Sequence, residues 1–224
     1  MSLSLLREFC AENFTDVPAA IEAGADRIEL CDNLAVGGTT PSAGVIGAAT
    51  VYAHEHGARV MTMIRPRGGD FVYGPAELQM MQSDIETACR LGTDGIVFGC
   101  LERREHGFWL DLSAIEALVA RVRWMQDQRI DITFHMAFDE LAPEDQFEAI
   151  DVLVKMGVTR ILTHGGPAGT PIDGNLPRLR ELIAYANGRL TILPGAGITY
   201  GNATRIAGEL GVDEVHGTKI VRLA

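Results

Sequence analysis

Residues 26–33, Asp-Arg-Ile-Glu-Leu-Cys-Asp-Asn, carry side chains of the types that do chemistry. Successive side chains in a short strand alternate between its faces, so Arg27, Glu29 and Cys31 share one face here. A parallel sheet that is covered on both sides normally has apolar residues on both faces of its strands. Packing does not explain a face with a guanidinium, a carboxylate and a thiol, so we interpret it as the wall of a functional site.

Other expected strands show the same mixture of side chains. If the apolar residues of each strand face outward toward helices, the inward residues include Glu8, Cys10, Glu29, Cys31, Met61, Met63, His135 and His216. Buried charges survive only when they are paired, so we expect Glu8 and Glu29 to meet Arg27 and Arg65. The alternative is an ionic network that does no more than fix the register of the strands.

Two loops have residues that suit an anion. Arg65 and Arg67 lie two residues apart in an extended segment stiffened by Pro66, and guanidinium forks fit carboxylate or phosphate. The glycine turn at 194–197 and the strand end at 216–217 would add main-chain donors. We therefore expect an anion site built from Arg27, Arg65, Arg67, Gly195, Gly197, His216 and Gly217. Solvated arginines and plain tight turns are the alternative.

His135 ends another expected strand, four residues before Asp139. It could act as a general acid or base with Asp139 orienting its ring, although a lone histidine in an apolar strand is more often a core residue. An enzyme with this site would act on a small anionic metabolite, phosphorylated or not, by isomerase, lyase or hydrolase chemistry. Its catalytic residues would be Glu8, Glu29, His135 and Asp139.

Short apolar runs alternate with helical stretches along the chain. Strands are expected near residues 5–10, 26–31, 59–64, 95–100, 130–135, 159–163, 190–194 and 213–217. Helices are expected near residues 15–24, 41–56, 75–91, 113–127, 143–157, 177–187 and 200–210. This strict alternation favours an α/β fold, the closed (β/α)8 TIM barrel, as a single domain over residues 1–224. The functional site would then lie at the C-terminal ends of the strands.

The segment after the last expected strand, residues 218–224, is too short for a complete eighth helix. The apolar outer face around Phe9 and Val215 then needs other cover, from a second copy of the chain or from the tail folding back. A symmetric partner is the common solution, so we expect a homodimer.

Composition narrows the class of partner. The net charge of −11 comes from 19 basic and 30 acidic residues without a basic block, which argues against nucleic acid and anionic membranes. The four cysteines form no CxxC pair, and no nucleotide or flavin motif is found. Without a signal peptide or a long apolar run, we expect a reduced, cytoplasmic protein that binds a small molecule or an ion.

Several strings in the chain resemble those of the CutC family of copper homeostasis proteins. They are residues 25–31, 33–34, 37–42, 63–73, 134–135, 137–139 and 160–163, within a match that runs in order from residue 7 to about 218. The resemblance implies a TIM barrel, a cytosolic location and copper binding, with Cys10 and Cys31 matching the proposed copper ligands. The chain departs from the family pattern at Met136, where an arginine is expected, and in its first strand.

The residues themselves give copper(I) limited support. Thiolate and thioether ligands select Cu(I), and Cys10, Cys31, Met61 and Met63 come from three consecutive strands that face one interior. Adjacent strands lie about 4.8 Å apart, which suits two thiols that share a small ion. The alternative is that the cysteines pack as small apolar residues.

Overall fold

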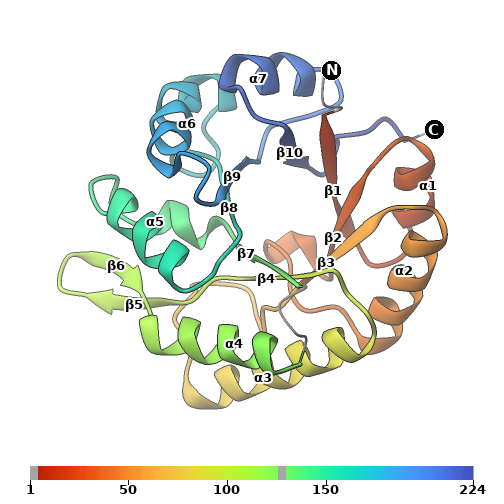
Figure 1. Ribbon diagram of the computed structural model, residues 1–224, viewed down its shortest axis with the longest axis horizontal. Helices are drawn as coiled ribbons and strands as arrows, with labels where there is room; N and C mark the ends of the chain where they lie inside the picture. Colours follow the sequence, from red (N-terminus) through yellow and green to blue (C-terminus); the bar gives the residue numbers. More distant parts are fainter. Residues whose placement is uncertain (1–4, 126–129, 224) are drawn as a thin grey trace.

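The computed structural model describes residues 5–125 and 130–223, and its centre is a sheet of eight parallel strands in the order β10-β1-β2-β3-β4-β7-β8-β9. The strands are β1 (Leu6–Glu12), β2 (Arg27–Cys31), β3 (Arg59–Met63), β4 (Gly95–Phe98), β7 (Asp131–Phe134), β8 (Arg160–Thr163), β9 (Thr191–Pro194) and β10 (Glu214–Gly217). Beyond β9 and β10, Thr199 and Lys219 form a parallel bridge that joins the two ends of the sheet. The result is a nearly closed barrel, which confirms the expected (β/α)8 fold (Figure 1).

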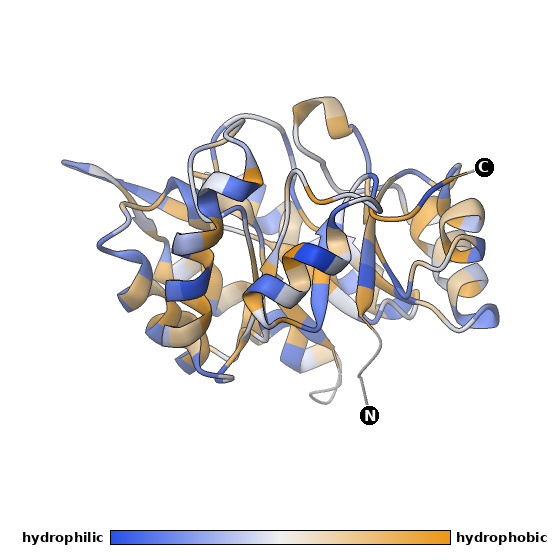
Figure 2. Cartoon of the chain, turned by 90° about the horizontal axis from the view of Figure 1, so that it is seen from above, coloured by the Kyte–Doolittle hydropathy of each residue, from blue (hydrophilic) through white to orange (hydrophobic). Residues whose placement is uncertain are grey.

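Seven α-helices of the described residues ring the strands (Figure 1). They are α1 (Val17–Glu22), α2 (Ala43–Glu55), α3 (Pro75–Arg90), α4 (Leu112–Met125), α5 (Gln146–Lys155), α6 (Ile172–Ala186) and α7 (Ala203–Leu210). Side chains cap three of them. Ser42 accepts a hydrogen bond from the Val45 N–H, Glu77 accepts one from the Gly74 N–H, and Asp111 accepts one from the Ala114 N–H. Hydrophobic and hydrophilic segments lie side by side on the helices, as helices with one packed and one exposed face require (Figure 2).

The structure differs from the expected boundaries in two regions. Helix α6 begins at Ile172 and contains Pro177, whereas the helix was expected only from about residue 177. Residues 101–110 form a hairpin that was not expected, made of β5 (Leu101–Arg104) and β6 (Gly107–Leu110), and it projects from the barrel (Figures 1 and 2). The end of the helix expected over 113–127 lies outside the described residues, as α4 is described to Met125.

The strands alternate as expected between an outer core and the barrel interior. Phe9, Ile28 and Val60 belong to the hydrophobic core shared with the helices. Cys10, Cys31, Met61, Met63 and Val97 form a separate cluster inside the barrel. In the register of β1 and β2, Cys10 lies opposite Glu29 and Glu12 lies opposite Cys31. The two inward cysteines therefore lie diagonally on adjacent strands, since Cys31 is two residues further along β2 than Glu29, the partner of Cys10.

No α-helix follows β10 in the described residues, and the C-terminal segment packs against the core instead. Ile220 and Val221 are buried, and Leu223 packs against the outer core. Phe9 and Val215 are 3% and 0% exposed within the single chain. Phe9 and Val215 are thus covered within the single chain, with the tail in the same hydrophobic core, and the homodimer stays a prediction.

Replacing Ile220 with Ala should lower the free energy of unfolding by about 2–4 kcal/mol, because it deletes a fully buried side chain and leaves a cavity. The control is Val51→Ala on the surface of α2, where the side chain is 58% exposed and the expected change is below about 0.5 kcal/mol. Urea unfolding followed by circular dichroism measures both. Equal changes in the two variants would contradict the role of the tail as cover.

Candidate functional site

A network of ion pairs fills the end of the barrel interior where the strands begin. Arg27 on β2 pairs with Glu8 on β1, and its Nη2 lies 2.6 Å from Oε2 of Glu214 on β10. Nε of Arg160 on β8 lies 3.0 Å from the same Glu214 oxygen. The expected pairing of Glu8 with Arg27 is confirmed. The Arg27 guanidinium is therefore engaged in the network and is not among the residues that line the cavity described below.

Glu8 also connects this network to the residues above it. Nδ1 of His216 donates to Oε1 of Glu8 at 2.8 Å, and Nε2 of His216 lies 3.7 Å from Oε2 of Glu29. Burial raises the pKa of Glu8, but the Arg27 charge and the hydrogen bond from His216 outweigh it and hold that pKa well below its usual range. Burial alone would lower the pKa of His216, but the negative charge of Glu29 holds it well above its ordinary value. The imidazole is thus a buried cation between two carboxyl groups.

The two inward cysteines lie beside Glu29 and His216. Sγ of Cys10, a carboxylate oxygen of Glu29 and a ring nitrogen of His216 lie within 4.8 Å of one another. Sγ of Cys31 lies 3.7 Å from Oε2 of Glu29. Interaction with the Cys31 thiol and burial raise the pKa of Cys10, and burial with the Glu29 charge raises the pKa of Cys31 to about 11 despite the opposing effect of Cys10. Both sulfurs are thiols at neutral pH in the absence of a metal.

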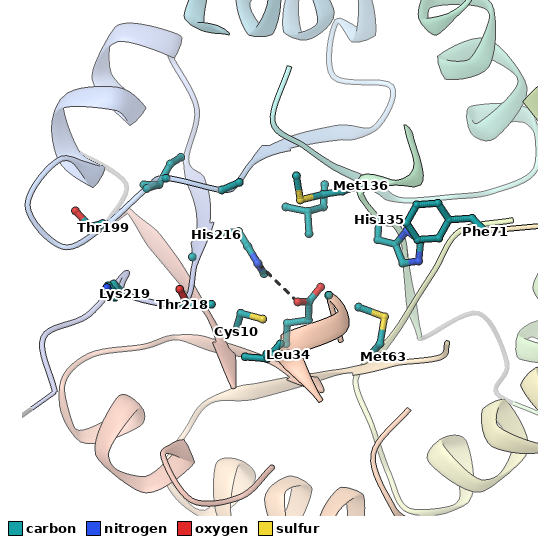
Figure 3. Close-up of a pocket in the computed structure, with 17 residues that line it drawn as sticks. Cys10, Leu34, Met63, Phe71, His135, Met136, Thr199, His216, Thr218 and Lys219 are labelled. Carbon is teal, nitrogen blue, oxygen red and sulfur yellow. Dashed lines mark ion pairs between the residues drawn. The ribbon is translucent and has the colours of Figure 1, made fainter. Parts of the chain in front are cut away.

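These groups open on a cavity of about 480 Å³ at the C-terminal ends of the strands (Figure 3). Cys10, Glu29 and His216 line one part of it, and His135 lines another. Apolar side chains such as Met63, Phe71, Met136 and Leu162 form most of the remaining wall. The cavity therefore lies where a TIM barrel carries its functional site, and its polar groups are few.

His135 is buried and neutral. Its Nδ1 accepts a hydrogen bond of 3.1 Å from the Ala137 N–H, so the ring proton is on Nε2. Burial and the Arg65 charge lower the pKa of His135 to about 3. Asp139 was expected to orient this ring, and that expectation is wrong. Asp139 accepts instead from the Thr163 hydroxyl and the His164 N–H, because η2 (Met136–Glu140) turns it toward the end of β8.

Arg65 and Arg67 bond to loop residues and are not among the residues that line the cavity. Arg65 donates to the carbonyl oxygens of Val36, Gly38 and Gly69 at 2.9 Å each, which ties the loops after β2 and β3 together. Arg67 pairs with Glu77 at 2.5 Å and with Asp70 at 3.1 Å. The expected contact between Glu29 and Arg65 is wrong, since neither residue bonds to the other in the described contacts. The arginine part of the expected anion site is therefore occupied by internal partners.

The glycine part of that site is closer to the expectation. Gly197 and Gly217 line the cavity, whereas Gly195 is not among its lining residues. A Cβ on Gly217 would collide with the Ile198 carbonyl oxygen, so glycine lets the loops after β9 and β10 meet closely. Lys219, Thr199 and Thr218 also line this end of the cavity, and sequence reasoning missed them (Figure 3). The available signal was that Lys219 is one of only two lysines and lies two residues after the last strand.

The fold and the cavity define a (β/α)8 barrel with a thiol, carboxylate and imidazole site at its mouth, and comparison with known proteins gives the family. The model of the CutC family matches residues 5–221, so this chain belongs to the CutC family. It is 58% identical over 217 residues to a CutC family protein of Enterococcus faecalis, and the match covers 97% of this chain and all of that protein.

Two further relatives extend the comparison. The human copper homeostasis protein cutC homolog is 39% identical over 211 residues, which are 94% of this chain and 72% of that protein. The crystal structure of CutC from Streptococcus agalactiae has a TM-score of 0.90 and 48% identity, and the match covers 97% of this chain and all of that one. Among the described residues, none of the helices has the length and apolar character needed to cross a membrane.

Replacing Glu8 with Gln should lower the free energy of unfolding by about 3 kcal/mol, because it leaves the buried Arg27 and His216 without their shared counter-charge. The Glu8 pKa is depressed on folding, so this stabilisation is present above the ordinary value of 4.5 and is lost as the pH falls. The difference in the free energy of unfolding between wild type and variant should therefore become smaller as the pH falls. Urea unfolding between pH 7 and pH 3 measures it.

The matched control for that experiment is Glu102→Gln in the hairpin. Glu102 pairs with Arg104 at 3.0 Å, but its side chain is 46% exposed. An exposed pair contributes about 0–1 kcal/mol, so this variant should stay near wild type at every pH. A loss as large as that of Glu8→Gln would contradict the special role of the buried pair.

Proposed function

We propose that this protein binds Cu(I) through Cys10 and Cys31 as part of copper homeostasis, the role for which its human relative is named. The observation that carries the proposal is the position of two inward thiols on adjacent strands, one of which opens on the cavity. Thiolates are the protein ligands that select Cu(I). The cytoplasmic location expected from the sequence would keep both sulfurs reduced.

The charges around the thiols support a thiolate complex of this ion. Two thiolates and one Cu(I) carry a net charge of −1, which is costly inside a barrel unless a cation lies nearby. The His216 imidazolium lies within 4.8 Å of the Cys10 sulfur and remains protonated through its bond to Glu8. His216 would thus balance the charge of the complex, and Glu29 would accept a proton that a thiol gives up.

Replacing Cys10 or Cys31 with Ser should abolish tight Cu(I) binding almost as completely as replacing both, because a single thiolate is a poor cage for this ion. Cys89→Ser and Cys100→Ser are the controls, since Cys89 lies in α3 and Cys100 follows β4, outside the interior cluster. Anaerobic competition with a Cu(I) chelator measures the affinity of all variants. Equal affinity in all of them would show that the interior thiols are only packing.

The affinity for Cu(I) should rise with pH. The pKa of Cys31 is raised to about 11 and that of Cys10 is raised as well, so both thiols must lose protons when the ion binds. Below the thiol pKa values, each tenfold fall in proton concentration favours the bound state. The same chelator competition at pH 6, 7 and 8, corrected for the chelator's own titration, measures this slope. An affinity that does not change with pH would contradict binding through thiolates.

A further inference from the structure

Three buried side chains of different chemistry converge at one part of the cavity wall. Sγ of Cys10 on β1, a carboxylate oxygen of Glu29 on β2 and a ring nitrogen of His216 on β10 lie within 4.8 Å of one another. All three residues are buried and line the cavity (Figure 3). An ion that enters through the cavity therefore meets a thiol, a carboxyl group and an imidazole together.

The Glu29 carboxyl group lacks the hydrogen bonds that a buried carboxyl group normally has. In the part of the chain that the structure describes, its Oε1 has no hydrogen-bond partner. Its Oε2 faces the weak thiol donor of Cys31 at 3.7 Å. Nε2 of His216 lies 3.7 Å from the same oxygen, beyond the roughly 2.7–3.2 Å of an ordinary hydrogen bond from nitrogen. Buried charges in proteins are paired or coordinate a metal, so Glu29 is suited to bind a cation directly.

Glu8 holds the His216 ring as the ring of a metal-binding histidine is held. Nδ1 of His216 donates to Oε1 of Glu8 at 2.8 Å, and Glu8 is fixed in turn by its ion pair with Arg27. A histidine that binds a metal almost always donates its other ring N–H to a carboxylate or a carbonyl, which sets the orientation of the ring. The nitrogen that remains for an ion is Nε2, which faces Glu29 (Figure 3, dashed line).

This set of ligands favours a particular metal ion. A thiolate, an imidazole and a carboxylate are all ligands of Zn²⁺, whereas Cu(I) selects thiolates and thioethers. Zn²⁺ with one thiolate, one carboxylate and a neutral imidazole has no net charge, which suits a buried position. Bonds of about 2.0–2.3 Å place tetrahedral ligand atoms about 3.4–3.6 Å apart, so side-chain shifts of about 1 Å or less bring the three atoms onto the ion.

We propose that Cys10, Glu29 and His216 form a binding site for Zn²⁺. The Cys10 thiol and the Nε2–H of His216 lose their protons to solvent when the ion binds, and water from the cavity takes the fourth coordination position. Cys10 also belongs to the proposed Cu(I) site, so the two ions exclude each other. Cys31 belongs to the copper pair alone, because it is not part of the group of three and does not line the cavity. Zinc binding does not depend on Cu(I) binding.

Anaerobic competition between the metal-free protein and a chromophoric Zn²⁺ chelator measures the affinity. Wild type should bind one Zn²⁺ per chain, and Cys10→Ser, Glu29→Gln and His216→Gln should each weaken binding at least about tenfold. The matched control is His54→Gln, which should stay within about twofold of wild type, because His54 pairs with Asp94 at 2.9 Å on the surface. A loss in this control as large as in the site variants would assign the ion to the surface and overturn the inference.

Co²⁺ in place of Zn²⁺ identifies the sulfur ligand by absorption. Wild type should show a thiolate-to-cobalt charge-transfer band together with the intense d–d bands of a tetrahedral complex. The charge-transfer band should be lost in Cys10→Ser and kept in Cys31→Ser, with a thermal melt to confirm that each variant is folded. Survival of the band in Cys10→Ser, or the absence of a saturable complex in wild type, would overturn the inference.

Cys31→Ser separates this site from the proposed copper site. The variant should keep its Zn²⁺ affinity within about threefold of wild type while it loses tight Cu(I) binding. Loss of both ions would assign zinc to the cysteine pair and overturn the site of three ligands. Wild-type protein that binds Zn²⁺ but not Cu(I) would leave this inference standing and remove the copper proposal. Wild-type protein that binds Cu(I) but not Zn²⁺ would do the reverse.

Discussion

The site at the barrel mouth depends on two interactions of the Glu8 carboxylate. One carboxylate oxygen pairs with Arg27 in the ionic network below, and the other accepts from the imidazole of His216 above. Because the network holds Glu8 ionised, Glu8 in turn keeps His216 protonated with its second nitrogen toward Glu29. The charges that face the cavity are therefore set by ion pairs deep in the barrel, where water does not screen them.

Two arginines, Arg27 and Arg65, stabilise the surroundings of the site at different levels of the barrel. Arg27 acts inside the barrel, where it joins β1, β2 and β10 through carboxylates. Arg65 acts above the strands, where it joins the loops after β2 and β3 through three carbonyl oxygens and covers the Phe71 ring at 4.8 Å. Phe71 lies 4.9 Å from the His135 ring, so the Arg65 clamp also fixes one wall of the cavity. Arginines that looked suited to a ligand are thus part of the frame.

The barrel and the inward residues could be predicted from the sequence, because strand alternation alone determines which side chains share the interior. The same alternation gave Glu8 next to Arg27 and Cys10 near Cys31. It could not reveal the partners of Arg65, which are main-chain carbonyls in loops whose path is not periodic. It also missed Lys219, since the close meeting of the last two loops depends on tertiary contacts at Gly217.

The closure of the sheet between β1 and β10 has a consequence for the order of events during synthesis. His216 and Glu8 are 208 residues apart in the chain, yet they form one hydrogen-bonded pair. A nascent chain that has made β1 and β2 holds the thiols and Glu29, but it lacks the imidazole and the last loop. Contacts of such long sequence separation form late in folding. The cavity therefore becomes competent only after the ribosome has released nearly the whole chain, so truncated products would carry cysteines without a finished site.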